Sequence, residues 1–140
     1  MTRQEIVQLF DRRNEAWRRH DAAALAADHA EASTVTSPIF GKISGRDAIL
    51  GTYRDLFAAF ADWIVEAQDF LIDGDRVAEV FTAKGTHVQE FFGVPGTGRR
   101  FLIRGVIVFD FKDGKIVHED RFYDFTGMLL QIGVLKAKPG

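Results

Sequence analysis

The sequence predicts a single α+β domain in which three helices precede a long antiparallel sheet. Apolar residues recur at helical spacing in the first 60 residues, whereas alternating segments separated by Asp-Gly turns fill residues 63–123. The length of 140 residues suits one compact core, and no linker, internal repeat or low-complexity segment interrupts it. We therefore expect one domain over residues 1–140.

Amphipathic helices are expected over residues 3–20 and 44–60, with a short Ala-rich helix between them. In the first helix, Ile6, Phe10 and Trp17 recur at helical spacing among charged residues and mark the buried face. Asp21 should cap the second helix, which runs to about residue 29, because its side chain can accept a hydrogen bond from a free backbone N–H. The buried stripe of the third helix contains Ile49, Tyr53, Leu56, Phe57 and Phe60.

Strands are expected over residues 63–72, 76–92, 99–111 and 115–123, followed by a closing helix over residues 125–135. Residues 33–43 leave room for one or two small strands. The odd-numbered residues of 99–111 are almost all apolar, so this face should meet the core. Neither face of 115–123 is cleanly apolar. A curved sheet that encloses a cavity accounts for this pattern, since pocket walls carry polar groups that a filled core rejects.

Composition excludes several classes of protein and site. The chain has no cysteine, which excludes disulfides and thiolate metal sites, and its four histidines lack the short spacing of a metal site. Lys and Arg number 18 against 20 Asp and Glu, without a basic block, so we expect no nucleic-acid partner. No apolar stretch predicts a signal peptide or a membrane span, so we expect a cytoplasmic protein without a membrane partner.

Seven short motifs follow one another along the chain. They are Phe60-Ala-Asp62, Asp73-Gly-Asp-Arg-Val77, Gly85-Thr-His87, Gly93-Val-Pro-Gly-Thr-Gly-Arg99, Gly114-Lys-Ile116, Phe122-Tyr-Asp124 and Leu129-Leu-Gln-Ile-Gly133. In order and spacing they resemble the SnoaL-like polyketide cyclase family of the nuclear-transport-factor-two-like superfamily, over roughly residues 10–133. The chain departs from that pattern at Asp120, where many relatives carry tryptophan, and at Gly96, which replaces the second proline of the usual turn.

The resemblance implies a cone-shaped α+β barrel, with the N-terminal helices packed in a strongly curved sheet around an apolar pocket. It also implies a cofactor-independent aldol condensation or isomerisation of a bulky apolar carbonyl compound, with Asp124 at the motif position of the acid/base. Two alternatives stay open, namely a non-catalytic small-molecule-binding protein with the same pocket and an epoxide-hydrolase-like enzyme. Whether the chain is an enzyme therefore stays open at this point.

The candidate catalytic residues also allow structural interpretations. Asp124 directly precedes the closing helix, so it is either the acid/base or only the N-cap of that helix. His87 has the parity of Val77 and Phe81, which predicts an inward side chain that orients a substrate oxygen or has a structural hydrogen bond. His20 and His29 lie near helix ends, where we expect them to be solvated.

Further residues are candidates for the pocket wall and for a subunit contact. His118 and Asp120 lie on the Asp124 face of the last strand. The other expected substrate-binding residues are Tyr53, Phe57, Trp63 and Phe122.

Arg104 and Arg121 are expected to be surface or subunit-contact charges, with neutralisation of an anionic substrate as the alternative. The odd-numbered face of 117–123 and the closing helix offer more apolar surface than a small monomer exposes. They therefore predict a homodimer through the sheet, which the resemblance also implies.

Overall fold

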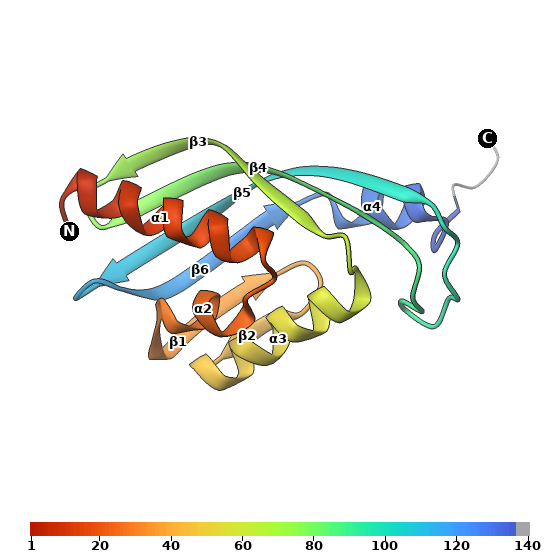
Figure 1. Cartoon of the computed structure of the whole chain (residues 1–140), viewed down its shortest axis with the longest axis horizontal. Coiled ribbons are helices and arrows are strands. Elements are labelled where there is room, and N and C mark those ends of the chain that lie inside the picture. Colours follow the sequence, from red (N-terminus) through yellow and green to blue (C-terminus); the bar gives the residue numbers. More distant parts are fainter. Residues whose placement is uncertain (137–140) are drawn as a thin grey trace.

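The computed structural model describes residues 1–136 and places four helices around a six-stranded sheet (Figure 1). Residues 137–140, which the one-domain expectation included, lie outside the described residues. The helices are α1 (Arg3–Arg18), α2 (Ala22–Ala27), α3 (Arg46–Ala59) and α4 (Phe125–Ile132). The strands are β1 (His29–Ser37), β2 (Gly41–Ser44), β3 (Ile64–Asp73), β4 (Arg76–Thr86), β5 (Arg100–Lys112) and β6 (Lys115–Tyr123).

The sheet curls around the first three helices without closing. Its strand order is β2-β1-β6-β5-β4-β3, so that β2 and β3 are the two edges within the described residues. The β1–β6 pair is parallel and the other neighbouring pairs are antiparallel. Figure 1 shows α1 running along the strands, α2 and α3 together near β1 and β2, and α4 at the opposite end of the molecule. The structure confirms the predicted α+β class.

Local sequence signals account for the helix starts. Thr2 forms a capping box with Glu5, because its hydroxyl accepts the Glu5 N–H while the Glu5 carboxylate accepts the Thr2 N–H, each at 3.1 Å. The Asp21 side chain accepts the Ala24 N–H at 3.0 Å, which confirms the predicted cap of α2. Ile6, Phe10 and Trp17 are buried, as the helical spacing predicted.

A β-bulge in β6 changes which residues of that strand face the core. Phe111 pairs with Ile116 but Asp110 pairs with His118, so Val117 is an extra residue in β6. One inserted residue inverts the alternation of side chains along the strand. The inward-facing side chains are therefore Ile116 before the bulge and Glu119, Arg121 and Tyr123 after it. The prediction that the odd-numbered residues of 117–123 form a subunit contact is therefore wrong for Glu119, Arg121 and Tyr123.

Three predicted boundaries also differ from the structure. The strand predicted over 76–92 ends at Thr86. Residues 87–99 form a connection, in which Phe91 and Val94 pair in an isolated antiparallel bridge. The helix predicted over 125–135 ends at Ile132, because Gly133 takes the left-handed conformation, with φ 82°, that terminates a helix. The small strands expected over 33–43 are β1 and β2, and β1 begins earlier, at His29.

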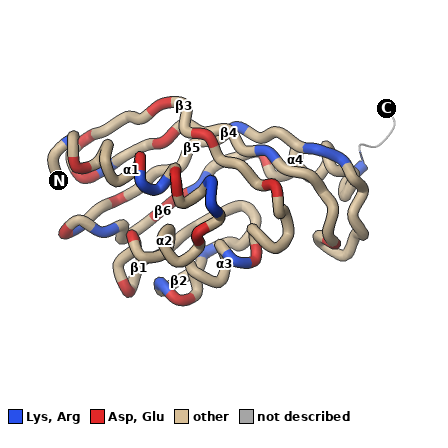
Figure 2. The backbone as a smooth tube through the Cα atoms, in the orientation of Figure 1, with Lys and Arg blue, Asp and Glu red and all other residues tan. Residues whose placement is uncertain are grey.

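Charged residues of both signs alternate over the molecule. Figure 2 shows Lys and Arg interspersed with Asp and Glu along the helices and the strands. None of the helices within residues 1–136 is long and apolar enough to span a membrane.

Candidate functional site

A small cavity lies between the helices and the concave face of the sheet, and we call it the interior cavity. Its wall is mostly apolar, because Trp17, Leu56, Trp63, Phe81, Ile107 and Tyr123 line it together with Arg121. Ile39 and Phe40, in the turn between β1 and β2, also contribute to the wall. The cavity leaves about 30 Å³ of open space, which is room for about one water molecule.

Gly105 allows the cavity wall to pack as it does. A Cβ atom at this position would lie 2.3 Å from the Phe122 carbonyl oxygen and 2.9 Å from the ring of Phe81. Gly105 pairs with Phe81 on β4 and with Tyr123 on β6, and the rings of these two neighbours have centroids 6.4 Å apart. The glycine therefore lets two aromatic walls of the cavity approach the middle strand closely.

Two hydrogen-bond donors of the cavity wall are buried without a partner. The indole Nε1 of Trp63 and the guanidinium Nη2 of Arg121 make no hydrogen bond with any described residue. Both residues line the interior cavity. A buried N–H without a partner is costly, so each of these two donors is suited to a ligand oxygen in the cavity.

Arg121 belongs to a buried charge cluster, which we define as Arg13, Asp28, His29, Tyr53, Glu119 and Arg121. Within it, the Arg121 Nε donates to the Glu119 carboxylate, and His29 Nε2 lies 3.4 Å from the other Glu119 oxygen. Burial alone raises the pKa of Glu119, but Arg121 and His29 outweigh it and hold that pKa well below its usual range. Burial lowers the pKa of His29, against the opposing effect of Glu119. Glu119 is therefore ionised, with its Oε2 accepting from Arg121 and its Oε1 buried without a hydrogen-bond partner among the described residues.

The other half of the cluster is held by α1. Arg13 Nη1 donates to Asp28 at 3.1 Å and to the Leu25 carbonyl at 3.0 Å, while its Nη2 donates to the Tyr53 hydroxyl at 3.2 Å. Arg12 makes a second ion pair with Asp28, at 2.9 Å. Asp28 is thus neutralised by two guanidinium groups, and the hydroxyl of Tyr53 connects Arg13 to His29, whose Nε2 lies 3.4 Å away.

Glu79 is a further buried carboxylate beside this cluster. It lies on the inner face of β4 with 3% of its surface exposed, between the inward residues Val77 and Phe81. None of the ion pairs within residues 1–136 includes Glu79. Burial raises the pKa of Glu79 to about 7, although Arg13 opposes this shift.

Two expectations about charged residues are wrong. His29 is fully buried rather than solvated, because β1 begins at this residue and carries it into the core. The Arg121 side chain is buried rather than at the surface, because the bulge turns it inward and Glu119 neutralises it. Arg104 is exposed, as expected.

The sequence contained signals for two cluster members that were missed. Arg13 follows Ile6 and Phe10 on the predicted buried stripe of α1, and Glu79 has the parity of Val77 and Phe81.

The predicted wall residues separate into an inner and an outer group. Trp63 lines the interior cavity, and Tyr53 is fully buried in the charge cluster. Phe57 is half-buried and stacks on His20, with ring centroids 4.2 Å apart.

His118, Asp120 and Phe122 lie on the outer face of the sheet, where Phe122 is 55% exposed. They do not line the interior cavity, because the bulge at Val117 moves the even-numbered residues after it outward.

His87 lies in the core as its parity predicted, at the end of β4 nearest α4. Its Nδ1 is 3.0 Å from the Thr97 hydroxyl, which donates to the Ile132 carbonyl at 2.7 Å. The other ring nitrogen, Nε2, is buried without a partner. His87 thereby ties the 87–99 connection to α4. Any catalytic role for it stays a prediction.

Asp124 is the N-cap of α4. Its carboxylate accepts the Gly127 N–H at 2.8 Å and is exposed to solvent. This is the geometry that a helix cap requires. The acid/base role that the resemblance implies for Asp124 stays a prediction. No set of three or more His, Asp or Glu side chains within residues 1–136 is arranged to hold a metal ion.

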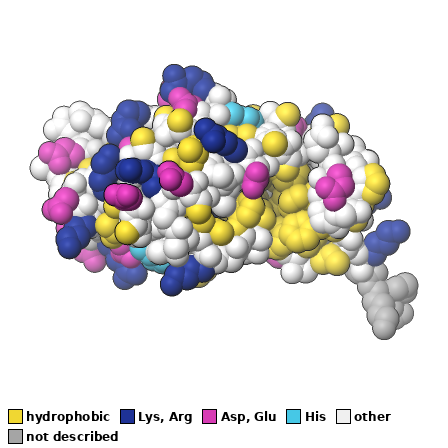
Figure 3. All heavy atoms as spheres, turned by 90° about the horizontal axis from the view of Figure 1, so that it is seen from below, with side chains coloured by type: hydrophobic (Ala, Val, Ile, Leu, Met, Phe, Trp, Pro, Cys, Tyr) yellow, Lys and Arg dark blue, Asp and Glu magenta, His cyan; other side chains and the backbone are white. Residues whose placement is uncertain are grey.

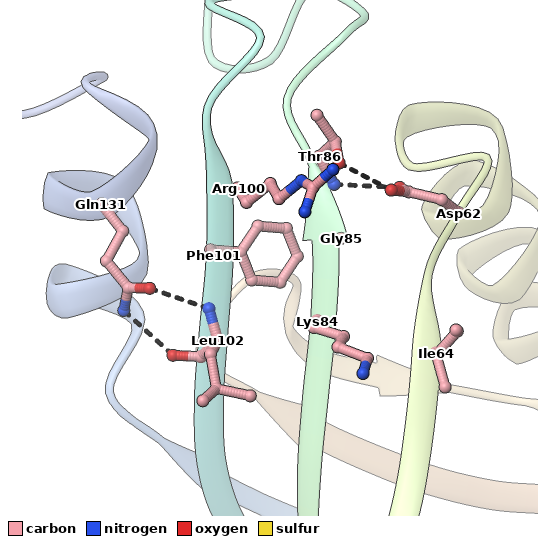
Figure 4. Close-up of a pocket in the computed structure, with 9 residues that line it drawn as sticks. All are labelled: Asp62, Ile64, Lys84, Gly85, Thr86, Arg100, Phe101, Leu102 and Gln131. Atoms are coloured by element: carbon pink, nitrogen blue, oxygen red, sulfur yellow. Dashed lines mark hydrogen bonds between the residues drawn. The ribbon is translucent and has the colours of Figure 1, made fainter.

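A second hollow, the outer groove, lies on the outside of the sheet near α4 and has about 580 Å³ of open space (Figure 4). Asp62 accepts hydrogen bonds from the Thr86 N–H at 2.9 Å and from its hydroxyl at 2.6 Å. Gln131 forms two hydrogen bonds with the backbone of Leu102. The polar groups joined by dashed lines in Figure 4 therefore form hydrogen bonds with one another that stabilise the fold.

Hydrophobic side chains gather toward the end of the molecule at which α4 and the C-terminus lie. Figure 3 shows this gathering on the face seen from below. Phe91 contacts Phe60, Phe92 and Phe125, with ring centroids 4.6 to 6.5 Å apart. Phe92 is 56% exposed, so this aromatic group continues from the core to the surface.

Comparisons with known proteins agree with the family and the fold. The family model of the SnoaL-like polyketide cyclases matches residues 7–132. AclR from Streptomyces galilaeus, a candidate hydroxylase, has a structure with a TM-score of 0.84 and 26% identity, covering 99% of this chain and 91% of AclR. IdmH from Streptomyces antibioticus, a candidate polyketide cyclase, has a TM-score of 0.78 and 30% identity, covering 91% of this chain and 97% of IdmH. No match was found among curated proteins.

Proposed function

Because the chain belongs to the SnoaL-like polyketide cyclase family, we propose that it is a cofactor-independent acid/base enzyme acting on an apolar carbonyl compound. The reaction begins with removal of a proton from the carbon next to the carbonyl. The resulting enolate is either reprotonated at another position, which is an isomerisation, or attacks a second carbonyl of the same molecule, which is an aldol condensation. The 30% identity to IdmH supports this substrate class.

The pair of unpartnered donors in the interior cavity carries the proposal. When the carbon loses its proton, the electron pair moves to the carbonyl oxygen, which becomes negative. Arg121 Nη2 and Trp63 Nε1 are buried in an apolar wall, where hydrogen bonds to a developing anion are stronger than in water. The buried charge cluster fixes the Arg121 guanidinium, because Glu119 accepts its Nε–H. Such preorganised donors lower the barrier to enolate formation.

Ligand entry requires part of the wall to move. The open space of about 30 Å³ is smaller than any ring compound. Ile39 and Phe40 are half-buried in the turn between β1 and the edge strand β2, and they line the cavity on that side. We propose that this turn moves outward when an apolar ligand enters.

One observation favours a second function, a binding protein without catalysis. None of the described residues that line the interior cavity is a carboxylate. A ligand held only by Arg121 and Trp63 would bind without losing a proton.

Deuterium exchange into 2-tetralone, a bicyclic apolar ketone, distinguishes the two functions. The enzyme should accelerate exchange at the carbons next to the carbonyl, whereas a binding protein should only raise its own melting temperature when the ketone is present. Trp63→Phe should slow the exchange by about 10²-fold, the usual effect of removing one donor to a developing anion.

Trp17→Phe is the matched control for this variant. It removes the same atoms from another part of the same wall, and the Trp17 nitrogen is not among the buried unpartnered donors of the described residues. Its exchange rate should fall far less than that of Trp63→Phe. Exchange by the wild type at the buffer rate would contradict the enzymatic function.

A further inference from the structure

The polar side chains in the wall of the interior cavity are nearly all hydrogen-bond donors. Trp17 and Trp63 each carry an indole N–H and Arg121 carries a guanidinium, and neither kind of group can accept a hydrogen bond. The remaining polar side chain is that of Tyr123, whose hydroxyl both donates and accepts. The other wall residues within residues 1–136 are apolar. A ligand in this cavity therefore meets side chains that donate to it and hardly any that accept from it.

Oxygen atoms of the same wall already accept hydrogen bonds from the protein. The Tyr123 oxygen accepts a backbone hydrogen bond from Ile39. The Trp17 carbonyl accepts the His20 N–H at 3.2 Å, and the Trp63 carbonyl lies 2.7 Å from Nε2 of the same histidine. The wall residues on β3, β4 and β5 belong to paired strands, whose carbonyls bond to neighbouring strands. An O–H group of a ligand would have to compete with these donors.

An acceptor atom of a ligand, in contrast, finds donors that are free. Trp63 is 5% exposed and the Arg121 side chain is 9% exposed, and the indole Nε1 and the guanidinium Nη2 are buried without a partner among the described residues. A ligand oxygen that reaches either group removes the cost of an unsatisfied buried donor. A hydroxyl oxygen can do the same, but its own proton gives up a hydrogen bond to water without replacement.

We propose that the interior cavity binds apolar ring compounds whose polar groups only accept hydrogen bonds, such as ketones, and discriminates against the corresponding alcohols. The inference deepens the proposed function, on which it rests for the choice of a carbonyl ligand. It states which polar groups the substrate carries where it contacts the wall. Arg121 and Trp63 are the residues that determine this specificity, because they supply the free donors.

The same selectivity affects how a product leaves the cavity. In an aldol condensation, the attacked carbonyl oxygen becomes an alkoxide, which takes up the proton released from carbon and becomes a hydroxyl. The substrate thus enters with an acceptor at this position, whereas the product carries an O–H group that the wall disfavours. The cavity therefore binds the substrate more tightly than the product, and product release is assisted.

The affinities of the wild type for 2-tetralone, 2-tetralol and tetralin, measured by titration calorimetry, test the inference. The three compounds share one ring system and carry a carbonyl, a hydroxyl and no oxygen, respectively. The ketone should bind about 10-fold more tightly than the alcohol, which is the usual effect of burying one O–H group without an acceptor. Equal affinities for the ketone and the alcohol would overturn the inference, since the wall would then supply an acceptor.

Trp63→Phe tests whether a donor of the wall is responsible. Phenylalanine keeps an aromatic ring but has no N–H, so 2-tetralone should bind about 10-fold more weakly than to the wild type. Tetralin makes no hydrogen bond and should bind no more weakly than to the wild type. An affinity for the ketone that falls no more than the affinity for tetralin would overturn the inference. Glu66→Gln, which neutralises an exposed carboxylate of β3, is the control and should bind all three compounds as the wild type does.

Failure of the inference and failure of the proposed function give different results. Weaker binding of the alcohol by a wild type that does not exchange deuterium into the ketone supports the inference and contradicts the enzymatic function. Exchange into the ketone together with equal binding of the alcohol overturns the inference and leaves the proposed function standing. If neither 2-tetralone nor tetralin binds, both fail. The comparison of ketone with alcohol uses the wild type alone, so it decides the inference even if Trp63→Phe does not fold.

Discussion

Replacing Glu79 with glutamine should stabilise the protein more at pH 8 than at pH 5. Glu79 is 3% exposed, and burial raises its pKa from the ordinary 4.5 to about 7. A carboxyl group whose pKa is higher in the folded state contributes stability that is fully present below pH 4.5 and is lost as pH rises through 7. Glutamine does not ionise, so the variant does not undergo this loss.

The size of the effect follows from the shift in pKa. Each pKa unit is worth about 1.4 kcal/mol, so the wild type should lose about 3 kcal/mol of unfolding free energy by pH 8 relative to acid pH. About 1 kcal/mol of this loss is already present at pH 5. The advantage of Glu79→Gln over the wild type should therefore grow by about 2 kcal/mol between pH 5 and pH 8.

Urea unfolding at equal protein concentration measures this difference. Curves at pH 5, 6, 7 and 8 are needed for the wild type, for Glu79→Gln and for the control Glu66→Gln, in which an exposed carboxylate of β3 is neutralised. The control should follow the wild type at every pH. A constant difference between Glu79→Gln and the wild type across this range would refute the reasoning, since it would mean that Glu79 is already ionised at pH 5 in the folded protein, with a pKa close to that in the unfolded chain.

Three further predictions concern the helix cap, the assembly and the cavity entrance. Asp124→Ala should lose about 1 kcal/mol in urea unfolding and Asp124→Asn almost nothing, with exchange of 2-tetralone by the asparagine variant near the wild-type rate; equal losses of stability would contradict the cap. The exposed Leu102 and Phe122 on the outer sheet face predict a homodimer, so sedimentation should give twice 15.7 kDa, and a species of 15.7 kDa alone would contradict it. Phe40→Ala should enlarge the interior cavity and increase the melting-temperature rise caused by the ketone, which an unchanged rise would contradict.

Periodicity within single elements predicted much of the fold. The apolar odd-numbered residues of β5 face the core, since Phe101, Ile103 and Phe109 are all buried. The cap at Asp21 formed as expected, because it depends only on a side chain and a backbone N–H three residues later. Such features require no knowledge of distant contacts, and they are visible in one stretch of sequence.

The candidate site was less predictable, because it depends on contacts between distant segments. The bulge at Val117 reverses the faces of β6 after Ile116, and the pairing of this strand with both β1 and β5 determines its position. Arg13 lay on the predicted apolar stripe, yet its burial becomes favourable only when Asp28, at the end of α2, and Tyr53 of α3 pack against it. The same holds for Arg121, whose partner Glu119 faces inward only after the bulge.

Deuterium exchange into 2-tetralone by the wild-type protein, measured between pH 5 and 8, tests the central claim most directly. We predict exchange well above the buffer rate, because the buried donors of Arg121 and Trp63 stabilise the enolate oxygen in the interior cavity. Exchange no faster than buffer at any pH, in a protein whose melting temperature the ketone raises, would contradict the claim and identify a binding protein.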